Sequence, residues 1–510
     1  TLLLEDLVLA TKDDPDIGTF WLHRYAATIA DVRGRFRPGK RAKSAFPKGD
    51  KQYSGVAAKR AKAAAELAKL ATKRKGPGTY ICIKAFRRLF DVVTDAAPLL
   101  RDAYVKDMDK AAGRFLEAVT KRQRVAIFGD YDVDGGASSA LLASWLRAMG
   151  QQATIYIPDR IDEGYGPNDE AMSALAKDHD LIICVDCGTL SHGPIAAAKG
   201  ADVIVLDHHL GGETLPDAVA VVNPNRQDES GDLAHLCAAG VVFLMLVDAN
   251  RILREQGQKG PDLIAMLDLV GLATVADVAP LIGVNRAFVR QGLTVMARRN
   301  RIGMTALSDV AGLDQAPTSY HLGFLLGPRV NAGGRIGKAD LGARLLSTND
   351  KHEAESIAAK LDALNTDRRE VEAQVRDLAL EQATERGLDG PLVWAAGEGW
   401  HPGVVGIVAA RLKEATNRPA IVIGLDGDEG KGSGRSVSGI DLGAVIQRAA
   451  AEGLLIKGGG HKMAAGLTVA RDMLEPAMAR LSELLAKQGA GDIGPADLKI
   501  SSILMPGAAT

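Results

Sequence analysis

The most informative segment of the chain is residues 124–136, which read RVAIFGDYDVDGG. The first six residues form a largely apolar run with β-branched and aromatic side chains, which predicts a buried strand over 124–129. Three carboxylates, Asp130, Asp132 and Asp134, then alternate along the chain before two glycines. Helix-forming sequence follows over residues 138–149. A buried strand, a turn and a helix in this order are typical of the start of a βαβ unit.

The sequence downstream repeats this alternation. Short apolar runs predict strands over residues 153–158, 181–185 and 201–206, with helix-forming sequence between them. Another short apolar stretch lies within residues 216–225, and helical segments continue to about residue 346. Strands that alternate with helices of this size predict an α/β domain built on a mostly parallel sheet.

A long helix and a second α/β unit are expected after this domain. Residues 351–386 are rich in Ala, Leu, Glu and Arg and contain neither Gly nor Pro, which predicts one continuous connecting helix. The later segments are expected in this order: a strand over 391–396, a helix near 403–415, a strand over 420–424, a Gly-rich turn, a helix over 442–451, a Gly cluster, another helix, and a strand over 498–504. The predicted fold is therefore a parallel-sheet α/β domain joined by a long helix to a second, smaller α/β domain.

Composition excludes several classes of protein. The chain has 510 residues, of which 46% are hydrophobic and 25% charged, as is typical of a globular protein with several domains. Four cysteines are too few for a disulfide scaffold and favour a reducing, cytoplasmic compartment. The longest apolar run, residues 236–247, is shorter than the roughly 20 residues of a membrane span. We therefore exclude a secreted miniprotein, a membrane protein and a fibrous protein.

The charge of the chain is unevenly distributed. The net charge is −1, but the first 100 residues carry 20 basic and 10 acidic side chains, with most of the excess between Arg33 and Arg88. Such a block could neutralise the phosphates of a polyanion, or it could be a solvated arm. A frame-shifted reading of the gene is a third explanation. These interpretations of residues 1–104, an atypical basic segment, remain open.

Titratable residues follow the later predicted strands as well. Asp186 comes directly after one strand, and residues 207–209 (Asp-His-His) come directly after the next. A further acid, Asp277, follows an apolar, helix-like run. Because ligands bind beyond the carboxyl ends of the strands in α/β sheets, we expect these side chains to share one site with the first three carboxylates.

The chemistry of this set favours a metal centre. Carboxylates packed together repel one another unless a cation neutralises them, although acidic turns without a metal are also common. Oxygen ligands with one or two imidazoles suit Mn²⁺ or Mg²⁺ better than Zn²⁺. Two such ions about 4 Å apart would hold both oxygens of an in-line phosphoryl displacement. Phosphoester hydrolysis is therefore the reaction that this set serves best.

The order of the motifs resembles a known family. DYDVDG, VDCG, DHH and VADV, at residues 130–135, 185–188, 207–209 and 275–278, resemble the DHH phosphoesterase superfamily. Within it, the chain closely resembles the RecJ single-strand-specific exonucleases. The further matching blocks are GPRVNAGGR (327–335), WHPGVVG (400–406), GSGRSV (432–437) and GGGHKMAAG (458–466).

The resemblance implies a domain organisation and an activity. It implies a DHH domain at 105–346, a connecting helix at 347–388 and a substrate-binding DHHA1 domain at 389–490. Residues 491–510 would be the truncated start of an OB-like domain, with weakened grip and processivity as the expected consequence. The implied activity is 5′ to 3′ hydrolysis of single-stranded DNA to mononucleotides in DNA repair and recombination. A helicase and a single-strand-binding protein are the further partners that the family implies.

The resemblance also implies the metal ligands, with two divalent cations bound, Mn²⁺ in most members and Mg²⁺ as a working substitute. Asp132 and Asp134 would each hold one cation, and Asp186 would bridge the two. The remaining ligands would be Asp130 near the first cation and His208 and Asp277 at the second.

Catalytic roles are implied for His209, Asp134 and Asp186. His209 would contact the scissile phosphate or the leaving oxygen, and Asp207 would orient the imidazoles and fix their tautomer. The implied substrate-binding residues lie in a glycine-bearing loop and in the second domain, and they are Arg329, Asn331, Arg335, His401, Arg435, Ser436, Gly459, Gly460 and His461.

Two other functions compete with this interpretation. A related phosphoesterase could act on short oligonucleotides or small nucleotides, but most such enzymes lack the block at residues 400–406. A catalytically inactive scaffold could retain the DHH fold without its ligands, but every expected ligand is present in this chain.

Overall fold

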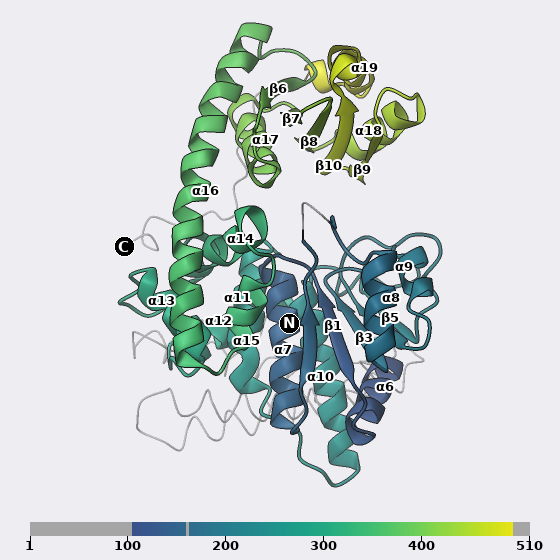
Figure 1. The fold of residues 1–510 in the computed structure, drawn as a ribbon, viewed down its shortest axis with the longest axis vertical. Coiled ribbons are helices and arrows are strands. Elements are labelled where there is room, and N and C mark those ends of the chain that lie inside the picture. The colour runs from purple at the N-terminus through teal and green to yellow at the C-terminus, as the bar shows by residue number, and fades with distance from the viewer. Residues whose placement is uncertain (1–104, 160–162, 493–510) are drawn as a thin grey trace, which may run out of the picture. The chain divides into compact units, whose positions relative to one another are not determined.

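The computed structural model describes residues 105–159 and 163–492, and all statements below concern these residues (Figure 1). The basic segment 1–104 and the strand expected over 498–504 lie outside them, so the predictions made for those segments stay predictions. None of the helices in the described part of the chain is long and apolar enough to cross a bilayer.

A five-stranded parallel sheet forms the first domain, as the alternation of strands and helices predicted (Figure 1). Its strands, in the order β2-β1-β3-β4-β5, pair only in parallel. They are β1 (Val125–Gly129), β2 (Ala153–Tyr156), β3 (Leu181–Val185), β4 (Asp202–Leu206) and β5 (Ala220–Val222). The helices that precede or connect them are α6 (Met108–Thr120), α7 (Val133–Ala148), α8 (Asp169–Asp178) and α9 (His192–Ala197). Every residue of β1 and β3 is buried, in agreement with the apolar runs that predicted them.

Helix α7 begins earlier than the sequence predicted. It starts at Val133, and Asp132 caps it by accepting hydrogen bonds from the main-chain N–H groups of Asp134 and Gly135 at 2.8 and 3.1 Å. A Cβ atom at Gly135 would lie 2.4 Å from the carbonyl oxygen of Asp130, so only glycine lets the helix start so close to the strand. Of the three alternating carboxylates, Asp130 therefore precedes the helix, Asp132 is its N-cap and Asp134 lies in its first turn.

Helices make up the rest of the first domain. They are α10 (Ala238–Glu255), η2 (Ile264–Met266), α11 (Leu267–Ala276), α12 (Gly283–Met296), α13 (Ile302–Val310), η3 (His321–Leu326, a π-helix), α14 (Gly327–Ile336) and α15 (Leu341–Ser347). Helix α7 packs against α10, α11 and α15. The apolar run at residues 236–247 lies mostly in α10, whose side chains are largely buried, so the run belongs to the protein core.

The glycine-bearing loop expected at residues 327–335 is helix α14, so that prediction is wrong. Glycine lowers helix propensity, but here it permits close packing. A Cβ atom at Gly334 would lie 2.6 Å from the carbonyl oxygen of Tyr131, and one at Gly333 would lie 3.0 Å from Leu361. Tertiary contacts therefore explain the glycines of this segment.

The long helix α16 (Lys351–Arg386) has the predicted bounds. Its first part packs against α13 and α14, and its later part against α17 (Pro402–Thr416) and β6 (Val393–Glu398). Val375 and Ala379 of α16 are buried in one core cluster with Trp400 and Val404.

The second domain has a mixed five-stranded sheet in the order β6-β7-β8-β10-β9. Strands β6 and β7 are parallel, and the other pairs are antiparallel. The remaining elements are β7 (Ala420–Asp426), β8 (Glu429–Arg435), α18 (Leu442–Ala451), β9 (Lys457–His461), β10 (Ala464–Ala470), η4 (Arg471–Met473), α19 (Leu474–Ala486) and η5 (Ala490–Asp492).

Both glycine-rich segments of this domain are strands, so the turn that the sequence predicted for the first of them is wrong. In β8, glycine recurs at alternate positions, 430, 432 and 434, so all three lie on one face of the sheet. A Cβ atom at Gly432 would lie 2.9 Å from Ile423 and 3.0 Å from Leu467. These large neighbours occupy the space that a side chain on β8 would need, which explains the glycines.

Candidate metal centre

The register of the parallel sheet brings the polar strand ends together. Gly129 is paired with Val185, Val185 with Leu206, and Leu206 with Val222, so four strands end at the same level. The residues that follow these four strands lie at one edge of the sheet, and they are Asp130, Asp186, Asp207 and Asn223. Three of them were expected at the site from the sequence.

All the predicted metal ligands converge at this edge. Their candidate ligand atoms fall into three groups, and within each group they lie within 4.8 Å of one another. The groups are Asp130, Asp132 and Asp186; Asp134, His208 and Asp277; and Asp186, His208 and His209. Asp186 and His208 each belong to two groups, so they connect the set.

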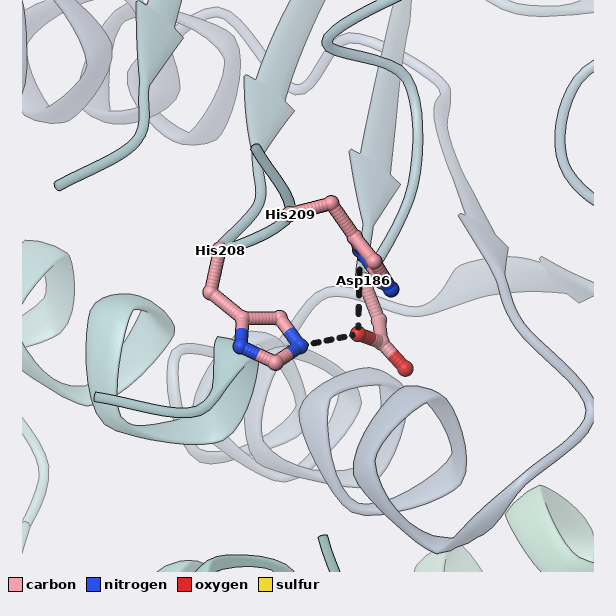
Figure 2. A group of neighbouring side chains, drawn as sticks. All are labelled: Asp186, His208 and His209. Carbon is pink, nitrogen blue, oxygen red and sulfur yellow. Dashed lines mark ion pairs between the residues drawn. The ribbon is translucent and has the colours of Figure 1, made fainter. Parts of the chain in front are cut away.

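Asp186 is at the centre of the cluster. Its Oδ1 atom lies 3.1 Å from Nε2 of His208 and 4.0 Å from Nδ1 of His209 (Figure 2). The same oxygen is buried and accepts no hydrogen bond from any of the described residues. Neighbouring ligands of an octahedral cation with bonds of about 2.1 Å lie about 3 Å apart, so the spacing fits atoms that share an ion. Asp186 also has a φ of +62°, an uncommon conformation that is often found at functional sites.

Asp134 is held by the start of a second helix. It is almost fully buried, and its two carboxylate oxygens accept hydrogen bonds from the main-chain N–H groups of Ala238 (2.6 Å) and Ala239 (2.8 Å) in the first turn of α10. Free N–H groups and the helix dipole make this end of a helix favourable for a negative charge. Asp134 therefore has a fixed position, with its Oδ2 atom 3.7 Å from Nε2 of His208.

The carboxylates of the cluster destabilise one another. Burial, followed by repulsion from Asp134, Asp132 and Asp130, raises the pKa of Asp186 well above its usual range. Burial and then the charges of Asp134 and Asp132 raise the pKa of Asp277 to about 8. Divalent cations would remove this repulsion, and the donor set of carboxylate oxygens with imidazole fits Mn²⁺ or Mg²⁺.

Asp207 positions His209. Its Oδ1 atom lies 2.8 Å from Nδ1 of His209, and its Oδ2 atom accepts a hydrogen bond from the main-chain N–H of Thr189 at 3.0 Å. Burial alone would raise the pKa of Asp207, but the hydrogen bonds from His209 and Thr189 lower it. Burial likewise opposes the charged form of His209, but Asp207 raises its pKa to about 9. With His208, Asp207 interacts through the main-chain N–H, which donates to its Oδ1 atom at 2.7 Å. Asp207 therefore orients the imidazole of His209 and not that of His208.

Several residues of the site were missed by the sequence analysis. Asn223 is fully buried, and its Nδ2 atom donates to the carbonyl oxygen of His209 and to Oγ1 of Thr189, both at 2.8 Å. Nδ2 of Asn225 donates to the carbonyl oxygen of His208 at 2.6 Å. The signal that could have found Asn223 is its place directly after a strand that is in register with the others. The Tyr165 hydroxyl donates to the carbonyl oxygen of Asp186 at 3.1 Å, but no pattern in the sequence pointed to it.

The substrate-binding residues predicted in the first domain lie on helix α14. Oδ1 of Asn331 accepts a hydrogen bond from the main-chain N–H of Val133 at 3.0 Å, which holds the start of α7. Nε of Arg329 pairs with Oδ1 of Asp362 at 2.8 Å, and Nη1 of Arg335 donates to the carbonyl oxygen of Gly403 at 3.2 Å. Asn331 therefore touches the acidic segment directly, Arg329 contacts α16, and Arg335 contacts the first turn of α17.

The candidates of the second domain differ in their surroundings. His401 caps α17, with Nδ1 accepting from the main-chain N–H of Gly403 at 3.0 Å, and Nη1 of Arg435 donates to Oγ of Ser433 at 3.0 Å. Ser436 is buried, and its hydroxyl donates to the carbonyl oxygen of Ile440 at 2.9 Å, so its expected contact with substrate is not supported. The last three candidates, Gly459, Gly460 and His461, lie on the edge strand β9.

Comparisons with known proteins agree with this arrangement. The family model for the N-terminal domain of the DHH family matches residues 124–274, and the DHHA1 model matches residues 389–487. Relatives named single-stranded-DNA-specific exonuclease RecJ occur in Dickeya dadantii (42% identical, 73% of this chain and 68% of the relative covered), Escherichia coli (39%, 74% and 69%) and Bacillus subtilis (38%, 74% and 48%). The chain thus spans between about half and about two thirds of the length of these relatives.

Two solved structures have the same fold. A RecJ exonuclease bound to manganese matches with a TM-score of 0.66 and 33% identity, over 76% of this chain and 96% of that one. RecJ from Thermus thermophilus in complex with Mn²⁺ matches with a TM-score of 0.65 and 32% identity, over 75% of this chain and 55% of that one. The aligned strand ends, the converging ligands and these similarities lead to one conclusion: the chain belongs to the RecJ family of DHH proteins.

Proposed function

We propose that this protein is a metal-dependent exonuclease that hydrolyses phosphodiester bonds of single-stranded DNA from the 5′ end and releases mononucleotides. The observation that carries the proposal is the convergence of the carboxylate and imidazole ligands around the buried Oδ1 atom of Asp186, which accepts no hydrogen bond from the described residues. The names of the relatives supply the substrate, and the 5′ to 3′ polarity rests on the family resemblance. A role in DNA repair and recombination in the cytoplasm, with a helicase and a single-strand-binding protein as partners, rests on the same resemblance.

We assign two divalent cations to the cluster, Mn²⁺ by preference and Mg²⁺ as a substitute. One would be held by Asp130, Asp132 and Asp186, and the other by Asp134, His208 and Asp277, with Asp186 shared. When bound, such cations would neutralise the phosphate oxygens and provide a nucleophilic hydroxide at neutral pH. The related RecJ from Thermus thermophilus has been solved in complex with Mn²⁺ and in complex with Mg²⁺, which supports this assignment.

Residues around the cations would position the metal ligands and donate a proton to the substrate. Asp207 keeps Nδ1 of His209 in a charged hydrogen bond and raises the pKa of this imidazole to about 9, so its Nε2 atom carries a proton at neutral pH. That proton can be donated to a phosphate oxygen or to the leaving 3′ oxygen. Asn331 acts indirectly, because it holds the start of α7, where Asp132 and Asp134 lie.

The other candidate functions have less support. An inactive scaffold has no need of a complete set of converging ligands. A phosphoesterase for short oligonucleotides or small nucleotides would use the same centre, and only substrate length distinguishes it from the exonuclease.

The testing experiment is digestion of single-stranded DNA oligomers in the presence of Mn²⁺. A label at the 5′ end should appear first as a mononucleotide, whereas a label at the 3′ end should pass through a ladder of shorter products. EDTA and Asp134→Asn should abolish both patterns. Asp202→Asn is the control and should retain them, because Asp202 is an exposed carboxylate on β4. Equal product release by the wild type and Asp134→Asn would refute the assigned centre. Activity confined to oligomers of a few nucleotides would favour the small-substrate enzyme.

A further inference from the structure

Two aromatic rings are exposed side by side on the π-helix η3 and the residue before it. Tyr320 is 65% exposed and Phe324 is 72% exposed, although the whole chain is only 4% aromatic. Their ring centroids lie 5.1 Å apart at an interplanar angle of 27°, which is a stacked arrangement. Large aromatic side chains are usually mostly buried, so an exposed stacked pair indicates a binding surface. A π-helix is itself rare and is frequently found at functional sites.

The segment that carries this pair packs against the helix that ends at the metal centre. A Cβ atom at Gly323 would be 3.3 Å from Cγ1 of Val275, and one at Gly327 would be 3.2 Å from Cβ of Ala276, so η3 packs closely on the last turn of α11. Asp277, a candidate metal ligand, is the residue that directly follows this turn. Gly323 and Gly327 therefore let η3 pack against the end of α11, directly before Asp277.

The segment that carries the pair is anchored to the rest of the protein. Leu322 and Leu326, which alternate with the exposed side, are fully buried. Nδ1 of His321 accepts a hydrogen bond from the main-chain N–H of Thr318 at 3.0 Å, which fixes the first turn. Rigid aromatic surfaces bind with little loss of conformational entropy.

We propose that Tyr320 and Phe324 form a stacking platform for a base of the single-stranded substrate, a few nucleotides from the scissile bond. The inference rests on the proposed function and adds a binding site to it. Every base has an aromatic face, so stacking on such a platform is tolerant of sequence, as an exonuclease that moves along any strand requires. The metal centre would contact the phosphate and not the base, so the platform would add a contact to the base.

The test places a fluorescent reporter on the platform of the full chain. Phe324→Trp is titrated with a thymidine oligomer of about 12 nucleotides and with an abasic oligomer of the same length, in EDTA so that cleavage cannot proceed. Leu378→Trp, at a half-exposed position on α16, is the matched control. The thymidine oligomer should quench the fluorescence of Phe324→Trp, and neither the abasic oligomer nor the control should show this effect. Equal quenching by both oligomers, or none at Phe324→Trp, would overturn the platform.

Affinity provides a second readout. Phe324→Ala removes the ring on which one base would stack, so it should weaken binding of the thymidine oligomer about tenfold. Phe324→Trp should restore this affinity, and the affinity for Mn²⁺ should be unchanged in both variants. Unchanged affinity for the oligomer, together with an altered oligomeric state in ultracentrifugation, would assign the pair to contact between copies of the chain and contradict the proposal. If the wild type binds in this way but hydrolyses no DNA, the platform is supported and the proposed function is refuted. If the wild type hydrolyses DNA while Phe324→Ala binds the oligomer normally, the proposed function is supported and the platform is refuted.

Discussion

The side-chain amide of Asn223 donates a hydrogen bond to the main-chain carbonyl of His209 over 2.8 Å. Strand β5 therefore fixes the loop after β4, because Asn223 follows the one strand and His209 follows the other. The same amide group also reaches Oγ1 of Thr189 in the loop after β3. One buried side chain thus ties together three strand ends that carry the metal centre.

Replacement of Asn223 by Ala should weaken metal binding without removing a ligand. The carbonyl of His209 and the hydroxyl of Thr189 would lose their donor, and changes of this kind around a metal site typically cost 10- to 100-fold in metal affinity. Calorimetric titration with Mn²⁺ measures the change. Asn250→Ala is the matched control, because Asn250 bridges Trp145 and Pro261 away from the centre. Similar losses of Mn²⁺ affinity in both variants would show that Asn223 acts only through general stability.

The stability of the metal-free protein should fall as the pH rises. The pKa of Asp277 is about 8 in the folded protein, against 3.8 as its ordinary value, so the folded state holds its proton more tightly than the unfolded state. This favourable contribution is complete below about pH 4 and is lost as the pH passes through about 8. Thermal unfolding in EDTA between pH 5.5 and 8.5 should show a steeper decline for the wild type than for Asp277→Asn. Identical pH dependence in the two proteins would contradict the raised pKa.

Activity at high pH should depend on Asp207. The Asp207 carboxylate raises the pKa of His209 from its ordinary 6.5 to about 9, so the protonated imidazole persists through neutral pH. Asp207→Asn should therefore shift the alkaline decline of kcat to lower pH, and His209→Gln should reduce kcat at every pH. The measurement is a profile of kcat from pH 6 to 10 on an oligomer substrate, with unfolding midpoints as the folding control. A decline at the same pH in wild type and Asp207→Asn would separate this carboxylate from the catalytic proton.

The glycines of β8 should be required for packing. Valine at Gly432 would place atoms within about 3 Å of Ile423 and Leu467, and overpacking of this kind typically costs about 1–3 kcal/mol. The denaturation midpoint of Gly432→Val should fall accordingly. Gly459→Ala in β9 is the matched control, because no atom lies within 4 Å of its added Cβ, and its stability should change little. Equal stability of the two variants would mean that β8 has room that the structure does not show.

The parts of this protein that were predictable from sequence are those set by local pattern. Strand β3 and helices α16 and α18 have the predicted bounds, since each is a continuous run with a clear apolar or helix-forming character. The convergence of the candidate metal ligands was also predictable, because strand ends in a parallel sheet meet at one edge.

The incorrect predictions concern glycines, and the residues that the sequence analysis missed are polar. Gly334 of α14 and Gly432 of β8 looked like loop residues, yet each makes room for a distant neighbour that the local sequence does not reveal. The positions of Asn223 and Tyr165 depend in the same way on contacts across the fold. Such residues become identifiable only when the tertiary contacts are known.

The most direct test of the metal centre is calorimetric titration of Mn²⁺ into the wild type and Asp186→Asn at pH 7.5. The wild type should bind two ions per chain. Asp186→Asn should lose at least one of them and weaken the other, because this carboxylate connects both ligand groups. Two ions bound with wild-type affinity by Asp186→Asn, or none bound by the wild type, would contradict the account of the centre.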